Sequence, residues 1–165
     1  MNDDLLTADE LKATLDYDPA TGVFAWKISP VSFIRAGQVA GYIRADGYVL
    51  IARKRKPYFA HRLAWLYMTG EWPKHNIDHI NGNQSDNRFE NLRDVTQSMN
   101  IQNQRKARGE SGFLGVSRYA GLLENWVANI SVNGKNVPLG VFDSPEKAHQ
   151  EYLKAKRLHH PGCTI

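Results

Sequence analysis

The chain has a single cysteine, Cys163, among its 165 residues, which excludes an internal disulfide and a four-cysteine zinc site. It also has no apolar run near the roughly 20 residues that a membrane-spanning helix needs. Its first ten residues are acidic, unlike those of a secretory signal. We therefore expect no membrane partner and a cytoplasmic location.

Acidic residues are scarce beyond the first 19 positions. Residues 1–19 contain six acids and one base, whereas residues 20–165 contain 20 bases and 11 acids. Basic clusters occur at 53–56 and again at Arg105, Lys106 and Arg108. This distribution fits a polyanionic partner such as nucleic acid. A basic surface with no partner has the same composition, so charge alone leaves both interpretations open.

Local patterns in the first 70 residues predict a mixture of helices and strands. Thr7 and Glu10 have the spacing of a capping box, which predicts a helix that continues to about Asp16. Apolar periodicity and turn residues predict the elements that follow. These are a turn at 18–22, strands at 23–28, 39–44, 48–53 and 58–60, a hairpin turn at 45–47, and a helix over 63–69 that ends at Gly70.

The pattern changes after residues 105–112, which are small or charged and which we interpret as a linker. Three short strands are predicted at 113–118, 126–132 and 136–142, followed by a helix with Ser144 as N-cap. Alternation in the second strand places Val127, Asn129 and Ser131 on an outward face. The opposite face is expected to be buried against the helix residues Ala148, Tyr152 and Ala155, and consists of Trp126, Ala128, Ile130 and Val132.

An acid and an imidazole stand side by side at Asp78 and His79. Hydrolysis of a phosphodiester needs a base that deprotonates water and a cation that neutralises charge on the phosphoryl and leaving oxygens. Histidine titrates near neutral pH and can be that base, while carboxylate and amide oxygens suit Mg²⁺. Adjacent side chains of a strand point to opposite faces. The two residues therefore share one metal only if the strand ends there, and otherwise they serve two sides of a phosphate.

Several motifs follow one another at fixed spacing between residues 58 and 104. They are His61-Arg62-Leu63-Ala64, Asp78-His79-Ile80-Asn81-Gly82-Asn83, Asp86-Asn87-Arg88, Asn91-Leu92-Arg93, Thr96 and Ser98-Met99-Asn100. In these motifs the segment resembles the HNH endonucleases of phages and mobile introns, and residues 5–57 resemble the N-terminal part of such phage proteins less specifically. The resemblance implies a ββα-metal fold.

The same resemblance implies a role for four residues. His79 would be the general base, Asp78 and Asn100 would hold one divalent ion, and Asn91 would tie down the loop that presents His79. Asn100 stands where the usual motif has histidine. Because an amide oxygen is a poor ligand for soft metals, we expect Mg²⁺ or Mn²⁺ rather than zinc.

Two simpler interpretations compete with a nuclease site. A calcium loop over residues 78–89 would need glycine at its sixth position and glutamate at its twelfth, where Asn83 and Phe89 stand. The other interpretation treats Asn81-Gly82 as an ordinary hairpin turn, with His79 and Asn100 as ordinary polar residues. His61 either hydrogen-bonds in the core or approaches the site, and we interpret it as structural.

Basic residues near these motifs are candidates for contact with DNA. Arg62, Arg88 and Arg93 are predicted to clamp a phosphate, although surface ion pairs fit them equally well. Arg105 and Lys106 are predicted DNA contacts on the basis of their cluster.

The C-terminal segment carries its own set of family residues. They are Ser111-Gly112-Phe113, Gly115-Val116, Trp126-Val127-Ala128, Ile130, Leu139-Gly140-Val141-Phe142, Ala148 and Tyr152. In these residues it resembles the plant-type APETALA/ethylene-response DNA-binding domain, which lays a three-stranded sheet in the major groove. The resemblance implies DNA contacts for Arg118, Asn129, Ser131 and Lys135. The plant family is rich in arginine at the outward positions of its strands. This chain departs from that pattern, because it has Ser117, Asn129 and Ser131 at such positions.

We therefore predict an α+β protein with two DNA-binding modules. Residues 1–104 would form an HNH endonuclease domain with an N-terminal β-hairpin region, 105–112 a linker, and 113–160 the second module. The protein would hydrolyse double-stranded DNA with a bound metal, nicking one strand as a monomer, in the host cytoplasm if phage-encoded. The alternatives are a non-catalytic, sequence-preferring DNA-binding regulator and an RNA-directed or structural protein.

Overall fold

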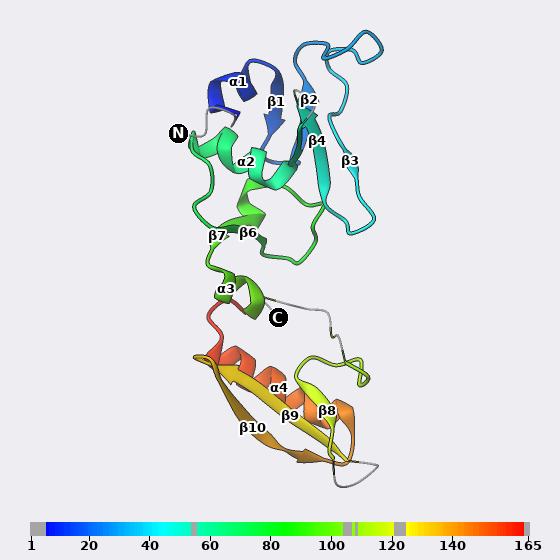
Figure 1. The fold of residues 1–165 in the computed structure, drawn as a ribbon, viewed down its shortest axis with the longest axis vertical. Coiled ribbons are helices and arrows are strands. Elements are labelled where there is room, and N and C mark those ends of the chain that lie inside the picture. Colours follow the sequence, from blue (N-terminus) through cyan, green and yellow to red (C-terminus); the bar gives the residue numbers. More distant parts are fainter. Residues whose placement is uncertain (1–5, 54–55, 104–106, 108, 121–124, 164–165) are drawn as a thin grey trace. The chain divides into compact units, whose positions relative to one another are not determined.

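The chain forms two units in a computed structural model, Met1–Thr96 and Gln97–Ile165 (Figure 1). The structure describes residues 6–53, 56–103, 107, 109–120 and 125–163. Small antiparallel sheets and short helices occur in both units, so the predicted mixed α+β class is confirmed. The division lies before the linker that we expected at 105–112, because Gly162 packs on the helix Gln97–Gln102 and its amide donates to Gln102 Oε1 at 3.1 Å.

The first unit begins with a short capped helix and a hairpin. Thr7 Oγ1 accepts from the Glu10 amide, and Glu10 Oε2 accepts from the Thr7 amide, so the predicted capping box is confirmed. The helix α1 (Ala8–Lys12) is shorter than predicted, because Leu15 and Tyr17 alternate with exposed Asp16 and Asp18 in a strand. This strand β1 (Leu15–Asp18) pairs with β2 (Val23–Trp26).

A three-stranded sheet and the longest helix of this unit come next in the chain. The predicted hairpin around residues 45–47 is present, although its first strand is shorter than expected. The elements are β3 (Tyr42–Ile43), β4 (Val49–Arg53), β5 (Lys56–Phe59) and α2 (Ala60–Thr69), and the sheet order is β3-β4-β5. Gly70 ends α2 in a left-handed conformation with φ 82°, as its position predicted.

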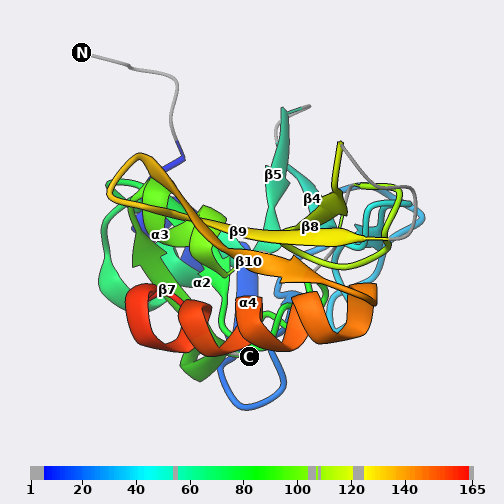
Figure 2. The same cartoon turned by 90° about the horizontal axis from the view of Figure 1, so that it is seen from below.

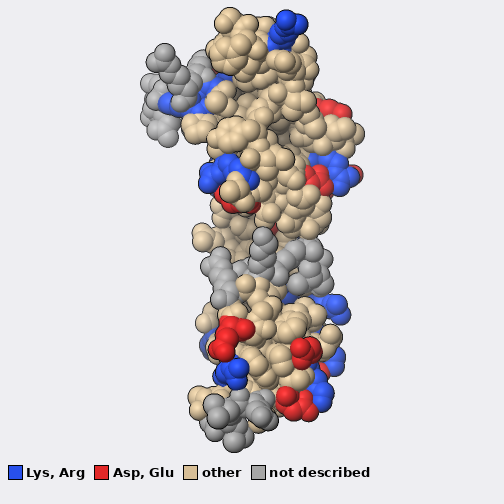
Figure 3. All heavy atoms as spheres, turned by 90° about the vertical axis from the view of Figure 1, so that its right-hand side faces the viewer, with Lys and Arg blue, Asp and Glu red and all other residues tan. Residues whose placement is uncertain are grey.

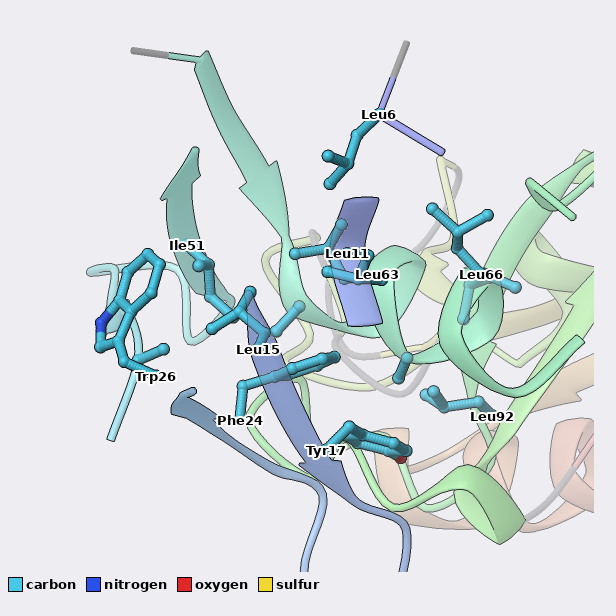
Figure 4. Packing of buried hydrophobic residues seen from close by; sticks show 14 residues of the cluster. Leu6, Leu11, Leu15, Tyr17, Phe24, Trp26, Ile51, Leu63, Leu66 and Leu92 are labelled. Atoms are coloured by element: carbon cyan, nitrogen blue, oxygen red, sulfur yellow. The ribbon is translucent and has the colours of Figure 1, made fainter. Parts of the chain in front are cut away.

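The core of the first unit lies between α2, the β1–β2 hairpin and the β3-β4-β5 sheet (Figure 4). Leu63 and Leu66 of α2 pack with Leu11 of α1 and with Leu15 and Phe24 of the hairpin. Another hairpin, made by β6 (Asn76–His79) and β7 (Leu92–Val95), adds Ile77 and Leu92 to this cluster. The 3₁₀ turn η1 (Phe89–Asn91) directly precedes β7.

The second unit combines the helix α3 (Gln97–Gln102) with a three-stranded sheet and a long helix. The strands are β8 (Val116–Arg118), β9 (Trp126–Val132) and β10 (Lys135–Phe142), in the order β10-β9-β8. The helix α4 (Pro145–His159) starts at Ser144, whose Oγ accepts from the Lys147 amide as the N-cap pattern predicted. It runs along one face of the sheet (Figure 2). Ala128 and Ala148 are fully buried between them.

None of the helices among the described residues is long and apolar enough to cross a membrane.

Truncation of a core side chain of α2 should destabilise the first unit. Leu63→Ala removes a fully buried side chain and should lower the free energy of unfolding by about 2–5 kcal/mol. Met68→Ala, at a position of the same helix that is 43% exposed, should lower it by less than about 1 kcal/mol. Urea denaturation of both variants measures the difference, and equal losses would show that α2 is not packed as described.

Candidate active site

The strand β6 ends at His79, where it presents the two residues that the sequence singled out. Asp78 pairs in register with Arg93 of β7, and His79 pairs with Leu92. Both side chains are buried, with exposed fractions of 7% for Asp78 and 4% for His79. Burial of a carboxylate and an imidazole is unfavourable unless partners satisfy them. Their partners therefore define the site.

Asp78 is held by an ion pair across the hairpin. Arg93 Nε and Nη2 both donate to Asp78 Oδ2, at 2.9 and 2.7 Å. Because the two residues are directly opposite each other in the ladder, the guanidinium reaches the carboxylate along one face of the strands. The carboxylate is thereby held in place beside His79.

His79 is fixed by a neighbouring amide. Its Nε2 lies 3.2 Å from Oδ1 of Asn87, which is itself only 2% exposed. Asn87 Nδ2 donates to the carbonyl of Ser85 at 3.2 Å, so the amide oxygen is the atom that faces His79. An oxygen acceptor requires a proton on Nε2, which makes Nδ1 the basic nitrogen of the neutral ring.

The pKa of His79 is lowered from its usual value because burial disfavours the charged ring. The hydrogen bond to Asn87 and the charges of Asp78 and Asp86 act in the opposite direction without outweighing the burial. His79 is therefore neutral at physiological pH. A neutral imidazole is the form that accepts a proton.

The loop between His79 and β7 is closed by Asn91. Its Oδ1 accepts from the Asn81 amide at 2.9 Å, and its Nδ2 donates to the carbonyl of Asp86 at 2.8 Å. Asp86 in turn binds Arg88 through Nε and Nη2, at 2.9 and 2.8 Å. This bonding lowers the pKa of Asp86 to about 2. Asn91 thus makes the loop contacts that its expected role requires, and the role itself stays a prediction.

An aromatic group encloses one side of His79. The His61 ring meets it edge to face at 5.1 Å, and the Tyr48 ring lies 6.0 Å away. Phe59 stacks on His61 at 5.3 Å. His61 is 7% exposed, and its Nδ1 is buried without a hydrogen-bond partner. Burial, with smaller contributions from His79 and Arg62, lowers the pKa of His61 to about 3.

The predicted phosphate-binding arginines are all engaged within the protein. Arg62 donates to the carbonyl of His75 at 3.3 Å, and its guanidinium lies 5.8 Å from the Trp72 ring. Arg88 binds Asp86 and Glu90, and Arg93 binds Asp78. Basic side chains lie in separate groups on the face shown in Figure 3, several of them beside acids. Their contact with DNA stays a prediction.

The predicted contacts of the second unit lie on and beside the sheet. Asn129 and Ser131 are on the face of β9 opposite the buried Ala128 and Ile130, as alternation predicted. Lys135 is exposed at the start of β10. Arg118 pairs with Glu110 at 3.1 Å, and its guanidinium lies 4.9 Å from the Trp126 ring. The predicted contacts Arg105 and Lys106 lie outside the described residues.

Asp78 has the chemistry that a hard divalent ion requires, since carboxylate oxygens are the ligands that such ions prefer. The described residues contain no group of three or more His, Cys, Asp or Glu side chains that could hold a metal. Mg²⁺ commonly uses only one or two protein ligands and keeps its waters, so an acid with one amide oxygen fits this ion. Asn100, the expected second ligand, lies on α3 in the second unit, and its pairing with Asp78 stays a prediction.

Asn87 is the functional candidate that sequence reasoning did not single out. It belongs to the quoted Asp86-Asn87-Arg88 motif, but nothing in the spacing shows which of these side chains turns toward His79. Tyr48 was also missed, because it is 31 positions from His79 and reaches it only through the β3–β4 hairpin. No local pattern records contacts of this range.

The described site is built on the strand β6, a polar loop and the strand β7. Residues 58–102 match the model of a family described as HNH endonuclease. The match supports the expected enzyme class, an HNH endonuclease, for this segment. The matched segment runs from β5 to α3, and residues outside it include the whole β1–β2 hairpin.

One solved structure is similar to most of the chain. Its title is "DNA binding and cleavage by the HNH homing endonuclease I-HmuI", and it has 21% sequence identity and a TM-score of 0.43. The alignment covers 90% of this chain and 88% of that one. No curated protein matches the chain.

Replacement of His61 should make the first unit less sensitive to acid. The unfolded chain takes up a proton near pH 6.5, whereas folded His61 does so only near pH 3. Between these values the unfolded state binds more protons, so His61 should cost up to about 1.4 kcal/mol of stability for each unit of falling pH. His61→Phe should remove this component. The exposed His75→Ala should retain it, and urea titrations from pH 7 to 4 distinguish the two. Parallel pH profiles in wild type and His61→Phe would contradict the burial described for this ring.

Proposed function

We propose that the protein is a metal-dependent endonuclease that hydrolyses phosphodiester bonds of double-stranded DNA and nicks one strand at each encounter. The observation that carries the proposal is the orientation of His79 by Asn87. It provides a neutral imidazole with Nδ1 as its basic nitrogen, next to the carboxylate of Asp78. The family match of residues 58–102 supports the same reaction class.

His79 is the general base in this proposal. Its Nδ1 would take a proton from the attacking water, and the charge formed on the ring would be stabilised by Asp78 and Asp86, which already act on its pKa. The hydrogen bond from Nε2 to Asn87 would strengthen as the ring becomes cationic. Asn91 would keep the loop, and with it Asn87, in the position from which this bond forms.

Asp78 and Asn100 would hold one Mg²⁺ or Mn²⁺ ion. When bound, the ion supplies charge neutralisation at the phosphoryl and leaving oxygens. Arg93 would orient the carboxylate of Asp78 toward its ligand position, since both of its donors hold the same oxygen. One such site acts on one strand, so a monomer would nick.

The second unit would hold the DNA while the first cuts it. Its outward strand face carries Asn129 and Ser131, which are short polar side chains able to reach base edges and phosphates in the major groove. Lys135 adds a positive charge at the start of β10. Attachment through one chain would raise the effective concentration of DNA at the nuclease site. Arg62, Arg88 and Arg118 would contribute where phosphate replaces their present acidic or carbonyl partners.

Loss of the base should abolish cleavage. His79→Ala should reduce the conversion of supercoiled plasmid to open circle by roughly 100-fold or more in the presence of Mg²⁺. Chelation of the metal should have the same effect on the wild-type protein. His75→Ala changes an exposed histidine that pairs with Asp94 and should nick at the wild-type rate. Nicking that survives His79→Ala would refute the assignment of the base.

Loss of the outward amide and hydroxyl of β9 should weaken binding without affecting the fold. Asn129→Ala combined with Ser131→Ala should raise the dissociation constant for duplex DNA by roughly 30-fold at physiological salt, since each polar contact is worth about 1 kcal/mol. Gln150→Ala, on the exposed side of α4, is the neutral control. Equal affinities of the two variants for DNA would place the binding surface elsewhere.

A further inference from the structure

The β1–β2 hairpin contacts the catalytic loop although it lies outside the segment matched by the family. Tyr17 Oη donates to the carbonyl of Asn87 at 2.7 Å. The amide of Phe89 donates to the carbonyl of Pro19 at 3.3 Å. The hairpin and its turn therefore hold the loop on both sides of Arg88.

Gly22 makes the third contact of the same hairpin. A Cβ at this position would lie 2.4 Å from the amide nitrogen of Arg88 and 2.5 Å from the carbonyl carbon of Asn87. These distances are shorter than any van der Waals contact, and both partners are backbone atoms that have no rotamer to change. The φ of +74° also disfavours any other residue. The turn thus lies directly against the peptide that joins Asn87 to Arg88.

Tyr17 is itself firmly anchored. Its side chain is 7% exposed, and its ring lies 4.7 Å from that of Phe24 (Figure 4). The ring of Tyr67 lies 5.6 Å away. Burial, with contributions from Asp18 and Asp86, raises its pKa well above the usual value. The phenol is therefore protonated throughout the working range of pH and always available as a donor.

These contacts end at Asn87, whose side chain binds His79. We propose that Tyr17 and Gly22 are positioning residues of the nuclease site, which set the place of Asn87 and through it the tautomer and orientation of the His79 ring. This inference rests on the proposed function for its kinetic consequence, whereas its structural consequence at His79 does not. The segment 58–102 alone would accordingly be an incomplete nuclease.

The chain offers a matched control for each substitution. Gly37 has a φ of +84°, close to that of Gly22, but a Cβ added there meets nothing within 4 Å. Gly37→Ala therefore reproduces the backbone strain of Gly22→Ala without the collision with the loop. Tyr58, whose ring stacks on Trp72 at 5.9 Å, provides the corresponding Tyr→Phe control. Tyr17→Phe keeps the buried ring and removes only the donor, so it tests the proposal even if Gly22→Ala fails to fold.

The first measurement is the nitrogen NMR spectrum of the His79 imidazole in the full-length, metal-free protein. The wild-type ring should carry its proton on Nε2. Tyr17→Phe and Gly22→Ala should raise the fraction protonated on Nδ1, because Asn87 is released, whereas Tyr58→Phe and Gly37→Ala should leave the spectrum unchanged. Wild-type imidazole signals in both hairpin variants would overturn the proposal.

The second measurement is plasmid nicking with Mg²⁺, alongside thermal unfolding of each variant. Tyr17→Phe should lower kcat by roughly tenfold and Gly22→Ala by up to about a hundredfold, with KM changed by less than about twofold, since small displacements of a catalytic group cost this much. Losses of kcat that follow stability equally in the hairpin variants and in their controls would overturn the proposal. A wild-type protein that does not cut DNA would refute the nuclease function alone, and the imidazole spectrum would still decide the role of the hairpin.

Discussion

The hydrogen bond between His79 and Asn87 is the interaction on which the rest of the site depends. A buried imidazole without a partner for its N–H would cost free energy, and a ring with its proton on the other nitrogen would present no base where Nδ1 now lies. Asn87 resolves both problems, provided that its own orientation is fixed. Its side-chain Nδ2 donates to the carbonyl of Ser85, and its backbone carbonyl accepts from Tyr17. These two bonds fix the orientation in which Oδ1 faces His79.

Electrostatics in the loop follow from pairs of opposite charge placed two residues apart or directly across the ladder. Asp86 binds Arg88, and Asp78 binds Arg93. Removal of Arg93 would leave the buried carboxylate of Asp78 without its partner, which is more costly than the pair is stabilising. The arginines are therefore parts of the scaffold first. DNA phosphate can recruit them only by competing with a carboxylate, which explains why arginine in such a motif does not by itself identify a phosphate clamp.

Sequence patterns predicted the elements whose causes are local. The capping box at Thr7, the N-cap at Ser144, the end of α2 at Gly70 and the alternation of β9 all depend on residues close together in the chain, and all are present. The strand β1 was missed because a capping box fixes where a helix starts and says nothing of where it ends. The bond between Tyr17 and Asn87 spans 70 positions and has no local signature. Local sequence patterns therefore cannot predict which residues make contacts of this range.

The rings of two buried histidines, His61 and His79, are in contact in the first unit. His61 lies between Phe59 and Tyr48, and its burial keeps it from becoming charged near neutral pH. A second cation 5.1 Å from His79 would oppose protonation of its ring. A neutral His61 is therefore compatible with the proposed role of His79 as base. The aromatic side also excludes water from one face of His79. Exclusion of water strengthens the action of Asp78 and Asp86 on the ring, because the same charges act through a lower dielectric. In the proposed mechanism the neighbours of His79 would therefore have two separate roles: the surrounding rings lower its resting pKa, and the two carboxylates would stabilise the charge that it acquires as the base.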